Sequence, residues 1–270
     1  MPRKVTMPII ESPRQISFKE VALPDPGPRE VTIQVKACAI CGSDVHVFKG
    51  MHPAAPLPAG AGHELSGVVA EMGKEVSRFK VGDRVCMNPM LFCGKCYYCR
   101  RSQFNHCVQV TFCYRVGQSG FAQYINRDED WVYHLPDSLS FEEGAVIEPT
   151  ATAVHAAQSS GIQLGTKIAV FGAGPIGLQT LQAAKAHGAT WAAIVDVVDY
   201  RLVWQRSWGQ MSQSMLARWI RCSACASSAM AWAWTSPMNA WAWSRRCASV
   251  WPPSRREGGP WPWGSSRIRK

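Results

Sequence analysis

KIAVFGAGPIGLQTLQAAKAHGATWAAIVD, residues 167–196, is the stretch that indicates the fold most clearly. Residues 167–171 are mainly apolar and predict a buried strand, and TWAAIVD, residues 190–196, predicts a second strand. The segment PIGLQTLQAAKAHG lies between them and predicts a helix. Strand, helix and strand in this order form a β-α-β unit, which places this part of the chain in the α/β class.

The turn of this unit contains Gly172, Gly174 and Gly177, spaced as G-x-G-x-x-G. In a dinucleotide-binding turn, the first glycine allows the tight bend, the second lets the backbone approach a pyrophosphate, and the third lets the helix pack on the strand. Asp196 ends the second strand 24 residues after Gly172, close to the spacing of an acid that binds ribose hydroxyls. Because an acid repels a 2′-phosphate, NAD is favoured over NADP. The alternative is an α/β turn that binds no nucleotide.

The preceding part of the chain predicts strands of a different kind. Apolar residues alternate with polar ones from Val31 to Ala37, and ELSGVVAE, DRVCMNP, FAQYINR and WVYHLP predict further short strands. Many short strands with irregular loops favour a barrel-like β domain. Ser140 precedes Glu143 by the spacing of a capping box, and Pro149 is well placed to open the next helix.

Four cysteines lie within CGKCYYCRRSQFNHC, in the spacing C-x2-C-x2-C-x7-C: Cys93, Cys96, Cys99 and Cys107. Four thiolates close a tetrahedral shell around Zn²⁺, so this spacing predicts a structural zinc that leaves no coordination position open for a substrate. Disulfides, an iron–sulfur cluster and free thiols are the alternatives. His106 is a further candidate ligand beside Cys107.

A second set of candidate ligands lies upstream. Cys41 in CAICGSDVHVFKG, together with His63 and Glu64 in AGAGHELSGVV, offers a thiolate, an imidazole and a carboxylate. Three protein ligands with an open fourth position are what a catalytic zinc site requires. Glu148 in VIEPT is a candidate to reach the same metal or its water. The alternative is that these are ordinary structural residues, since a single buried cysteine often only packs.

Charge and cysteine content narrow the class of protein. Residues 1–200 hold 18 Lys+Arg against 18 Asp+Glu, so the net charge of +10 comes from residues 201–270. A neutral body argues against nucleic-acid binding as the main function. No segment has the length or apolar character of a signal peptide or a membrane span, so a cytoplasmic protein without a membrane partner is expected. In a reducing compartment, eleven cysteines favour metal ligands or buried thiols over disulfides.

The segment 203–270 departs from everything before it. It contains ten of the twelve tryptophans and fits neither helical nor strand periodicity. This composition predicts a disordered or frame-shifted Trp/Arg-rich end. An interaction tail for acidic partners or membrane surfaces is the alternative.

Residues 1–202 resemble the zinc-dependent medium-chain alcohol dehydrogenases, in particular the sorbitol (polyol) dehydrogenase branch. The matching segments are CGSDVH, GHELSGVV, VGDRV, the four-cysteine loop, IEP, GAGPIG and VDVVDYR. The resemblance implies a GroES-like β-barrel catalytic domain at 1–150, the start of a truncated Rossmann NAD-binding domain at 151–202, and an atypical region at 203–270. It also implies an oxidoreductase that transfers hydride from a polyol or secondary alcohol to NAD. The alternative is a truncated, non-catalytic zinc-binding chain.

The resemblance also implies roles for individual residues. Zinc is implied at two places, a catalytic ion on Cys41, His63 and Glu64 and a structural ion on the four cysteines. Ser43 and His46 occupy the positions that relay a proton in related alcohol dehydrogenases, and Glu148 is implied beside the catalytic metal. Further coenzyme contacts are implied at Ile176, Asp196 and Arg201.

Two departures limit what the resemblance implies. Val47 stands where the mammalian sorbitol enzymes carry a substrate-contacting tyrosine, so the polyol is not specified. Residues 203–270 match no part of the family, and a family-like homo-oligomer is therefore not expected.

Overall fold

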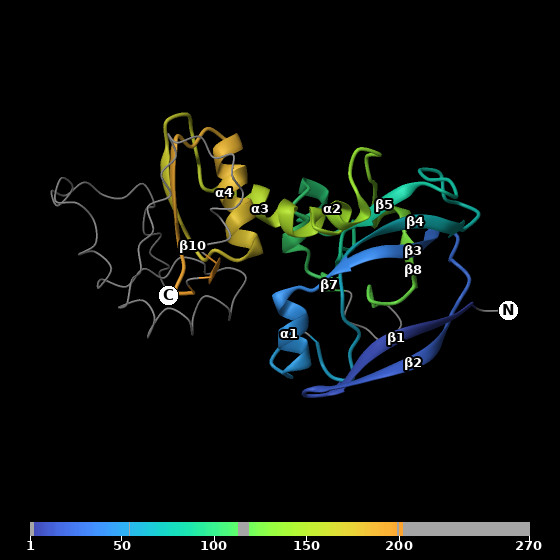
Figure 1. The fold of residues 1–270 in the computed structure, drawn as a ribbon. Coiled ribbons are helices and arrows are strands. Elements are labelled where there is room, and N and C mark those ends of the chain that lie inside the picture. The colour runs from blue at the N-terminus through green and yellow to red at the C-terminus, as the bar shows by residue number, and fades with distance from the viewer. Residues whose placement is uncertain (1–2, 54, 113–118, 199, 202–270) are drawn as a thin grey trace. The chain divides into compact units, whose positions relative to one another are not determined.

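The computed structural model describes residues 3–53, 55–112, 119–198 and 200–201 (Figure 1). The chain divides into two compact units, Met1–Gly161 and Ile162–Lys270. The predicted end at 203–270 lies outside the described residues. The predicted domain boundary at residue 150 stays a prediction.

The first unit is built on a curled, antiparallel five-stranded sheet in the order β8-β3-β4-β5-β9 (Figure 1). Its strands are β3 (Glu30–Ala39), β4 (Glu64–Met72), β5 (Arg84–Met87), β8 (Tyr124–Asp128) and β9 (Val132–His134). All five fall in segments whose alternating apolar residues predict strands. Their inward side chains form one cluster, in which Val31, Ile33, Val69, Val85 and Val132 have no exposed surface. Burial of this cluster is the main source of stability for the sheet.

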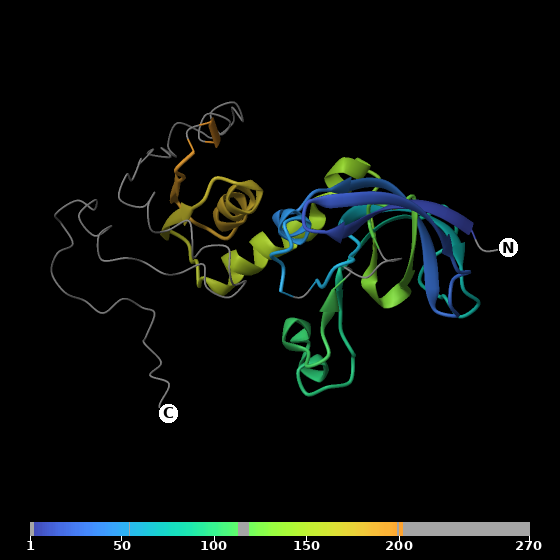
Figure 2. The same cartoon turned by 90° about the horizontal axis from the view of Figure 1, so that it is seen from below.

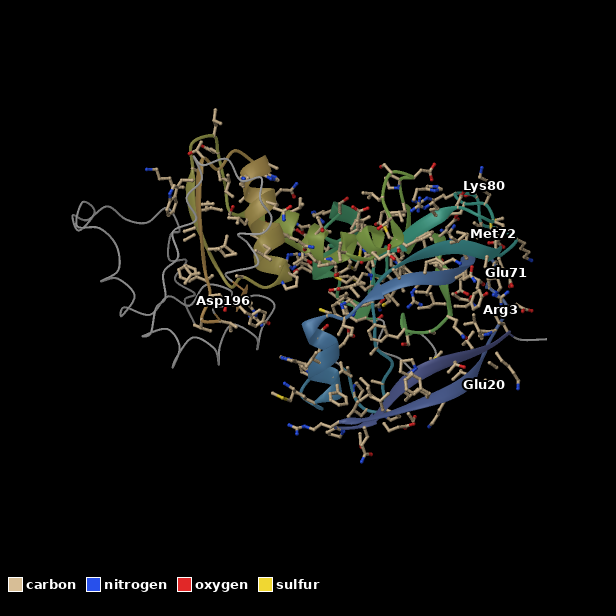
Figure 3. The ribbon with its side chains drawn as sticks, viewed as in Figure 1. Arg3, Glu20, Glu71, Met72, Lys80 and Asp196 are labelled. Atoms are coloured by element: carbon tan, nitrogen blue, oxygen red, sulfur yellow. The ribbon has the colours of Figure 1, made fainter. Side chains whose placement is uncertain are left out.

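A separate hairpin adds a second layer to this unit. Strands β1 (Arg3–Ser12) and β2 (Gln15–Leu23) pair antiparallel and bury their own apolar cluster. Arg3 on β1 pairs with Glu71 on β4 and lies over the ring of Tyr124, 3.9 Å from its centroid (Figure 3). These contacts join the hairpin to the five-stranded sheet.

The described residues of the first unit form three α-helices. The first is α1 (Gly42–Phe48), which directly follows β3. Helix α2 (Phe141–Ala145) begins as predicted, because the Ser140 hydroxyl accepts the Glu143 N–H and the Glu143 carboxylate accepts the Ser140 N–H. Helix α3 (Ile147–Ser159) begins two residues before Pro149, so the prediction that proline opens it was wrong. A proline is tolerated there because N–H groups of the first turn have no partner within the helix.

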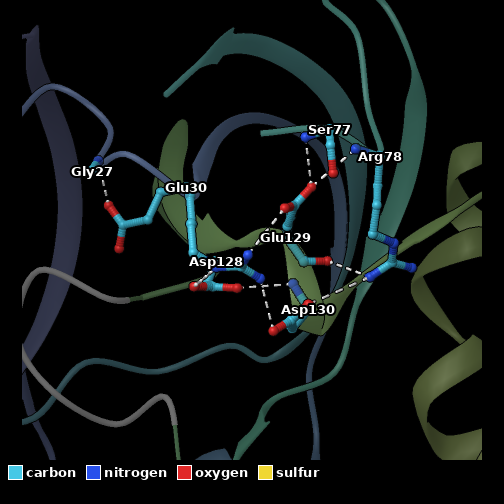
Figure 4. A network of polar contacts seen from close by, with 8 residues as sticks. Gly27, Glu30, Ser77, Arg78, Asp128, Glu129 and Asp130 are labelled. Atoms are coloured by element: carbon cyan, nitrogen blue, oxygen red, sulfur yellow. Dashed lines mark hydrogen bonds and ion pairs between the residues drawn. The ribbon is translucent and has the colours of Figure 1, made fainter. Parts of the chain in front are cut away.

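A buried carboxylate holds the loop after β4 against the turn η3 (Glu129–Trp131). Glu129 is 1% exposed and accepts the backbone N–H groups of Ser77 and Arg78, each at 3.0 Å (Figure 4). The Arg29 guanidinium lies 3.6 Å from the same carboxylate. Burial raises the pKa of Glu129, but these N–H groups and the arginines outweigh it, and the net pKa is lowered. The carboxylate therefore stays ionised and satisfied inside the unit.

The second unit contains the predicted β-α-β element. Strands β10 (Lys167–Phe171) and β11 (Trp191–Val195) pair in parallel, and α4 (Pro175–Ala186) connects them. The predicted order of a β domain followed by a β-α-β unit is confirmed. The prediction that β10 is buried was wrong, since Phe171 is 59% exposed. The reason is that only β11 and α4 cover β10 within the described region. None of the described helices has the length and apolar character needed to span a membrane.

Candidate functional site

Cys41, His63 and Glu64 come together at one end of the five-stranded sheet. Their ligand atoms all lie within 4.8 Å of one another. His63 and Glu64 are each only 7% exposed, and Cys41 is half-buried. Sulfur, nitrogen and oxygen donors at this separation, held in a protected place, fit a zinc ion with one position left open. The structure thus brings together the residues predicted as one set of ligands, while their binding of zinc stays a prediction.

The local fold explains this convergence. Cys41 precedes the first residue of α1, and its N–H donates to the Asp44 carboxylate at 2.8 Å. The N–H of Gly62, the residue before His63, donates to the same carboxylate at 2.9 Å. Gly62 has φ +83°, and a Cβ there would lie 2.8 Å from the ring of Phe121, so only glycine fits. One carboxylate thereby ties together the two segments that carry the ligands.

Asp44 also acts on the imidazole itself. Its Oδ1 lies 3.6 Å from His63 Nδ1, and both side chains are buried. Burial lowers the pKa of His63, but Asp44 and Cys41 outweigh that effect and raise it to about 10. A carboxylate beside a metal-ligating imidazole fixes the orientation of the ring. Asp44 was not predicted as part of this site. Its position three residues after Cys41 is the spacing of a capping box, which could have indicated its contact with Cys41.

Glu148, in the first turn of α3, lies within electrostatic reach of the ligand set. Burial raises its pKa; the charge of His63 opposes that shift, whereas Glu64 and Asp44 add to it. The pKa of Glu64 is also raised, mainly by burial. Buried carboxylates that repel one another are an arrangement suited to a divalent cation. The structure therefore places Glu148 near this cluster, as the resemblance implied.

The two residues implied in proton transfer lie on α1. The Ser43 hydroxyl is buried and has no hydrogen-bond partner among the described residues. His46 follows one turn later, at a spacing that places the two side chains on the same side of a helix. Val47 is fully buried and packs with Ile10 and neighbouring alanines. Val47 therefore belongs to the core of the first unit.

The four cysteines form a separate lobe of the first unit. Its base is the short ladder between β6 (Met90–Leu91) and β7 (Thr111–Phe112), and its tip carries the 3-10 turns η1 (Cys99–Arg101) and η2 (Phe104–His106). We refer to residues 90–112 as the cysteine lobe. Figure 2 shows the lobe, in green, extending away from the strands of the main sheet.

All four sulfurs of the lobe lie within 4.8 Å of one another, and all four are free thiols. The N–H groups of Cys93 and Gln109 donate to Cys107 Sγ at 3.3 and 3.4 Å. Backbone N–H groups, first those of Cys99 and Val108, lower the pKa of Cys96 to about 6. The pKa of Cys99 is instead raised to about 12, first by burial and then by its neighbours Cys96 and Cys107. Four cysteine sulfurs at this separation fit a closed zinc site. His106 is not part of this cluster.

The glycine turn of the second unit has the geometry that the sequence predicts. Gly172 has φ +107°, and a Cβ on Gly177 would lie 1.7 Å from the Gly172 carbonyl oxygen, so both positions require glycine. Gly174 precedes the first residue of α4, and a Cβ there would meet nothing within 4 Å. There is thus space beside Gly174, at the N-terminus of α4, where a pyrophosphate could approach the backbone. Ile176, in the first turn of α4, is 43% exposed.

Asp196 directly follows β11 and anchors this turn (Figure 3). Its Oδ2 accepts the Ala173 N–H at 2.7 Å, and its Oδ1 accepts the Val198 N–H at 2.9 Å. Arg201 Nη1 lies 3.4 Å from Oδ2. Burial raises the pKa of Asp196, but these donors outweigh it and lower the net pKa, so the group is an anion. A negative charge beside the glycine turn fits ribose hydroxyls better than a phosphate.

Comparisons with known proteins agree with this geometry. The family described as Alcohol dehydrogenase GroES-like domain matches residues 27–137. The protein named Sorbitol dehydrogenase from Bacillus subtilis (strain 168) is 38% identical over 206 residues, which are 75% of this chain and 58% of that protein. An Escherichia coli oxidoreductase/dehydrogenase of unknown specificity involved in membrane biogenesis has a similar structure, with a TM-score of 0.71 at 38% identity. The match covers 76% of this chain and 61% of that one.

A second solved structure, the 2R,3R-butanediol dehydrogenase from Bacillus subtilis, has a TM-score of 0.69 at 35% identity and covers 76% of this chain and 61% of its own. Residues 27–137 are therefore an alcohol dehydrogenase GroES-like domain. The matched part of the chain is a segment of the zinc-dependent medium-chain alcohol dehydrogenase family, in its polyol branch. The chain spans about three fifths of the length of these relatives.

Proposed function

We propose that this chain is a zinc- and NAD-dependent dehydrogenase that transfers hydride from a polyol or secondary alcohol to the coenzyme. The observation that carries the proposal is the buried set of Cys41, His63 and Glu64. The same chain carries a glycine turn shaped for a dinucleotide. Two of the relatives are named a sorbitol dehydrogenase and a butanediol dehydrogenase. These names support an alcohol with neighbouring hydroxyl groups as the substrate class.

Cys41, His63 and Glu64 would hold the catalytic zinc, which supplies Lewis acidity that lowers the pKa of an alcohol hydroxyl. Asp44 keeps His63 oriented, since its carboxylate lies beside Nδ1 and is itself fixed by two backbone N–H groups. Glu148 adds negative charge near the ligands and so helps to retain a cation. The four cysteines of the lobe would hold the structural zinc.

Oxidation of an alcohol releases a proton that must leave a buried place. The Ser43 hydroxyl can accept that proton and donate its own, because a hydroxyl is both donor and acceptor. His46 lies one helical turn further along α1 and is the next group able to take up a proton. We assign these two residues to a relay from the substrate toward solvent.

The second unit would hold the coenzyme. The N–H groups at the start of α4 bind the pyrophosphate beside Gly174, where the backbone is accessible. Asp196 accepts hydrogen bonds from the adenosine ribose, and its charge disfavours a 2′-phosphate. Ile176 offers an exposed apolar surface in the first turn of α4, and Arg201 steadies the Asp196 carboxylate.

Coenzyme binding tests this proposal directly. We expect NADH to bind the purified zinc-loaded chain saturably, measured by nicotinamide fluorescence, and to bind more tightly than NADPH. The Asp196→Ala variant should bind NADH more weakly, and the difference between its affinities for NADH and NADPH should be smaller than in the parent chain. The matched control is Asp25→Ala, which changes an exposed aspartate in the first unit. Absence of NADH binding by folded protein with two zinc ions would overturn the proposal and favour a zinc-binding chain without dehydrogenase activity.

A further inference from the structure

The cysteine lobe exposes a group of side chains that the proposed reaction does not use. Tyr97 is 62% exposed and Val108 is 72% exposed, and Tyr98 is partly exposed beside Tyr97, with 5.3 Å between the ring centroids. The Arg101 guanidinium lies over the Tyr97 ring, 3.7 Å from its centroid. A cation stacked on a tyrosine is held in place before any partner binds. Tyrosine and arginine held this way are the residue types that most often anchor protein interfaces.

Charge is segregated along this part of the sequence. Residues 84–127 contain six Lys and Arg and no acid, whereas residues 128–166 contain seven acids and no Lys or Arg. Within the described part of the chain, no ion pair joins Lys95, Arg100 or Arg101 to an acid. All three of these side chains are exposed. The surface of the lobe therefore carries aromatic rings and cations. Among the described residues, no acid of the same unit forms an ion pair with these three cations.

The complementary surface lies elsewhere on the same unit. Asp137, Glu142 and Glu143 are exposed in the segment 137–143, before and within α2. The Asp137 side chain is 99% exposed and its nearest cation, Arg84, lies 3.9 Å away. Residues 201–270 carry eleven basic residues and one acid, so their charge opposes docking on the lobe. A second copy of this chain offers the acids that the lobe lacks.

We propose that the cysteine lobe is a subunit interface, and that it docks on the acidic segment 137–143 of a second copy of this chain. Because each copy carries both surfaces, a two-fold arrangement makes the contact twice. A zinc ion on four thiolates adds a charge of about −2 to the lobe, so its net charge is small. Tyr97 and Tyr98 accordingly supply most of the affinity, and the charges set the orientation.

Sedimentation velocity of the full chain, over about 1–100 μM, tests this interface because that range spans weak specific association. We expect a monomer–dimer equilibrium in which Tyr97→Ser and Arg101→Glu each weaken association about tenfold, as interface anchors do. Lys80→Glu is the matched control, since it makes the same change of charge at an exposed site outside the lobe. Zinc content equal to that of the parent chain shows that the lobe is intact in each variant.

A charge exchange makes the test specific. Glu142→Lys should weaken association by itself, and mixing it with the Arg101→Glu variant should restore dimers, because both contacts of a mixed dimer then join opposite charges. A chain that stays monomeric throughout would overturn the proposal, as would dimers that none of these variants weakens. Binding of a single-stranded oligonucleotide by the lobe without self-association would also overturn it, because the same residues would then serve nucleic acid.

Discussion

Cys41, His63 and Glu64 come from two separated segments that the main sheet brings together, whereas the four cysteines of the lobe lie within one short stretch of chain. The first set rests on the ends of two long strands and on the hydrogen bonds of Asp44. The lobe has only two-residue strands and single 3-10 turns around its thiols. The protein core thus shapes the first site by itself, while we expect the lobe to depend on a bound metal for its own fold.

Replacement of Cys41 by serine gives the largest effect expected from this difference. It removes one ligand of the catalytic set and leaves the packing of the sheet unchanged. Activity should fall by about 10³-fold or more, since a Lewis acid is worth several kcal/mol of transition-state stabilisation. NADH absorbance measures the loss, and metal analysis should show one zinc fewer per chain.

Cys38→Ser is the matched control for that experiment. Cys38 lies on β3 outside the ligand set, and burial, with smaller contributions from Asp44 and Glu64, raises the pKa of its thiol to about 12. Because Cys38 is not part of the ligand set, this variant should keep both zinc ions and its activity. Full activity in Cys41→Ser would contradict the assignment of the catalytic site.

Replacement of Cys96 by serine should have the opposite profile. The lobe loses its zinc and unfolds locally, so the melting temperature and the soluble yield fall, while the activity of each chain that remains folded is largely kept. Differential scanning calorimetry and activity per soluble chain separate the two effects. If Cys96→Ser lost activity as completely as Cys41→Ser at equal stability, the proposed division of roles would be wrong.

The Asp44→Asn variant is expected to give the smallest change. It keeps the size of the side chain and removes the charge beside His63 Nδ1. Zinc affinity of the first site should fall about 10–100-fold, as for other partners of ligating histidines. Competition with a chromophoric chelator measures this change. Glu142→Gln, which neutralises an exposed acid, should leave the affinity unchanged, and an equal loss in both variants would rule out a positioning role for Asp44.

Local patterns predicted the elements that local interactions decide. The capping box at Ser140 starts α2, and the glycine turn, α4 and β11 follow one another in the predicted order. Such features involve residues a few positions apart, so the sequence shows both partners at once. The hairpin of β1 and β2 was not singled out, although its pairing is local and Val5, Met7 and Ile9 alternate along β1.

The errors have equally specific causes. The apolar composition of residues 167–171 predicts burial, but burial of a strand depends on which neighbours cover it. Pro149 was expected to open α3, but the helix begins two residues earlier, at Ile147. Neither the cover of a strand nor the exact start of a helix is visible in the local sequence.

By itself the sequence determined the elements of the β-α-β unit, the closed set of four thiols and the glycine turn, since each depends on spacing along a few residues. Only the tertiary structure decided that Cys41 and His63 meet, because their approach depends on α1 and β4 and on the Asp44 carboxylate that binds both segments. The same holds for the buried Ser43 hydroxyl and the exposed Tyr97 ring. Spacing fixes which groups can be neighbours within a turn, whereas distant neighbours and exposure follow from how the whole unit packs.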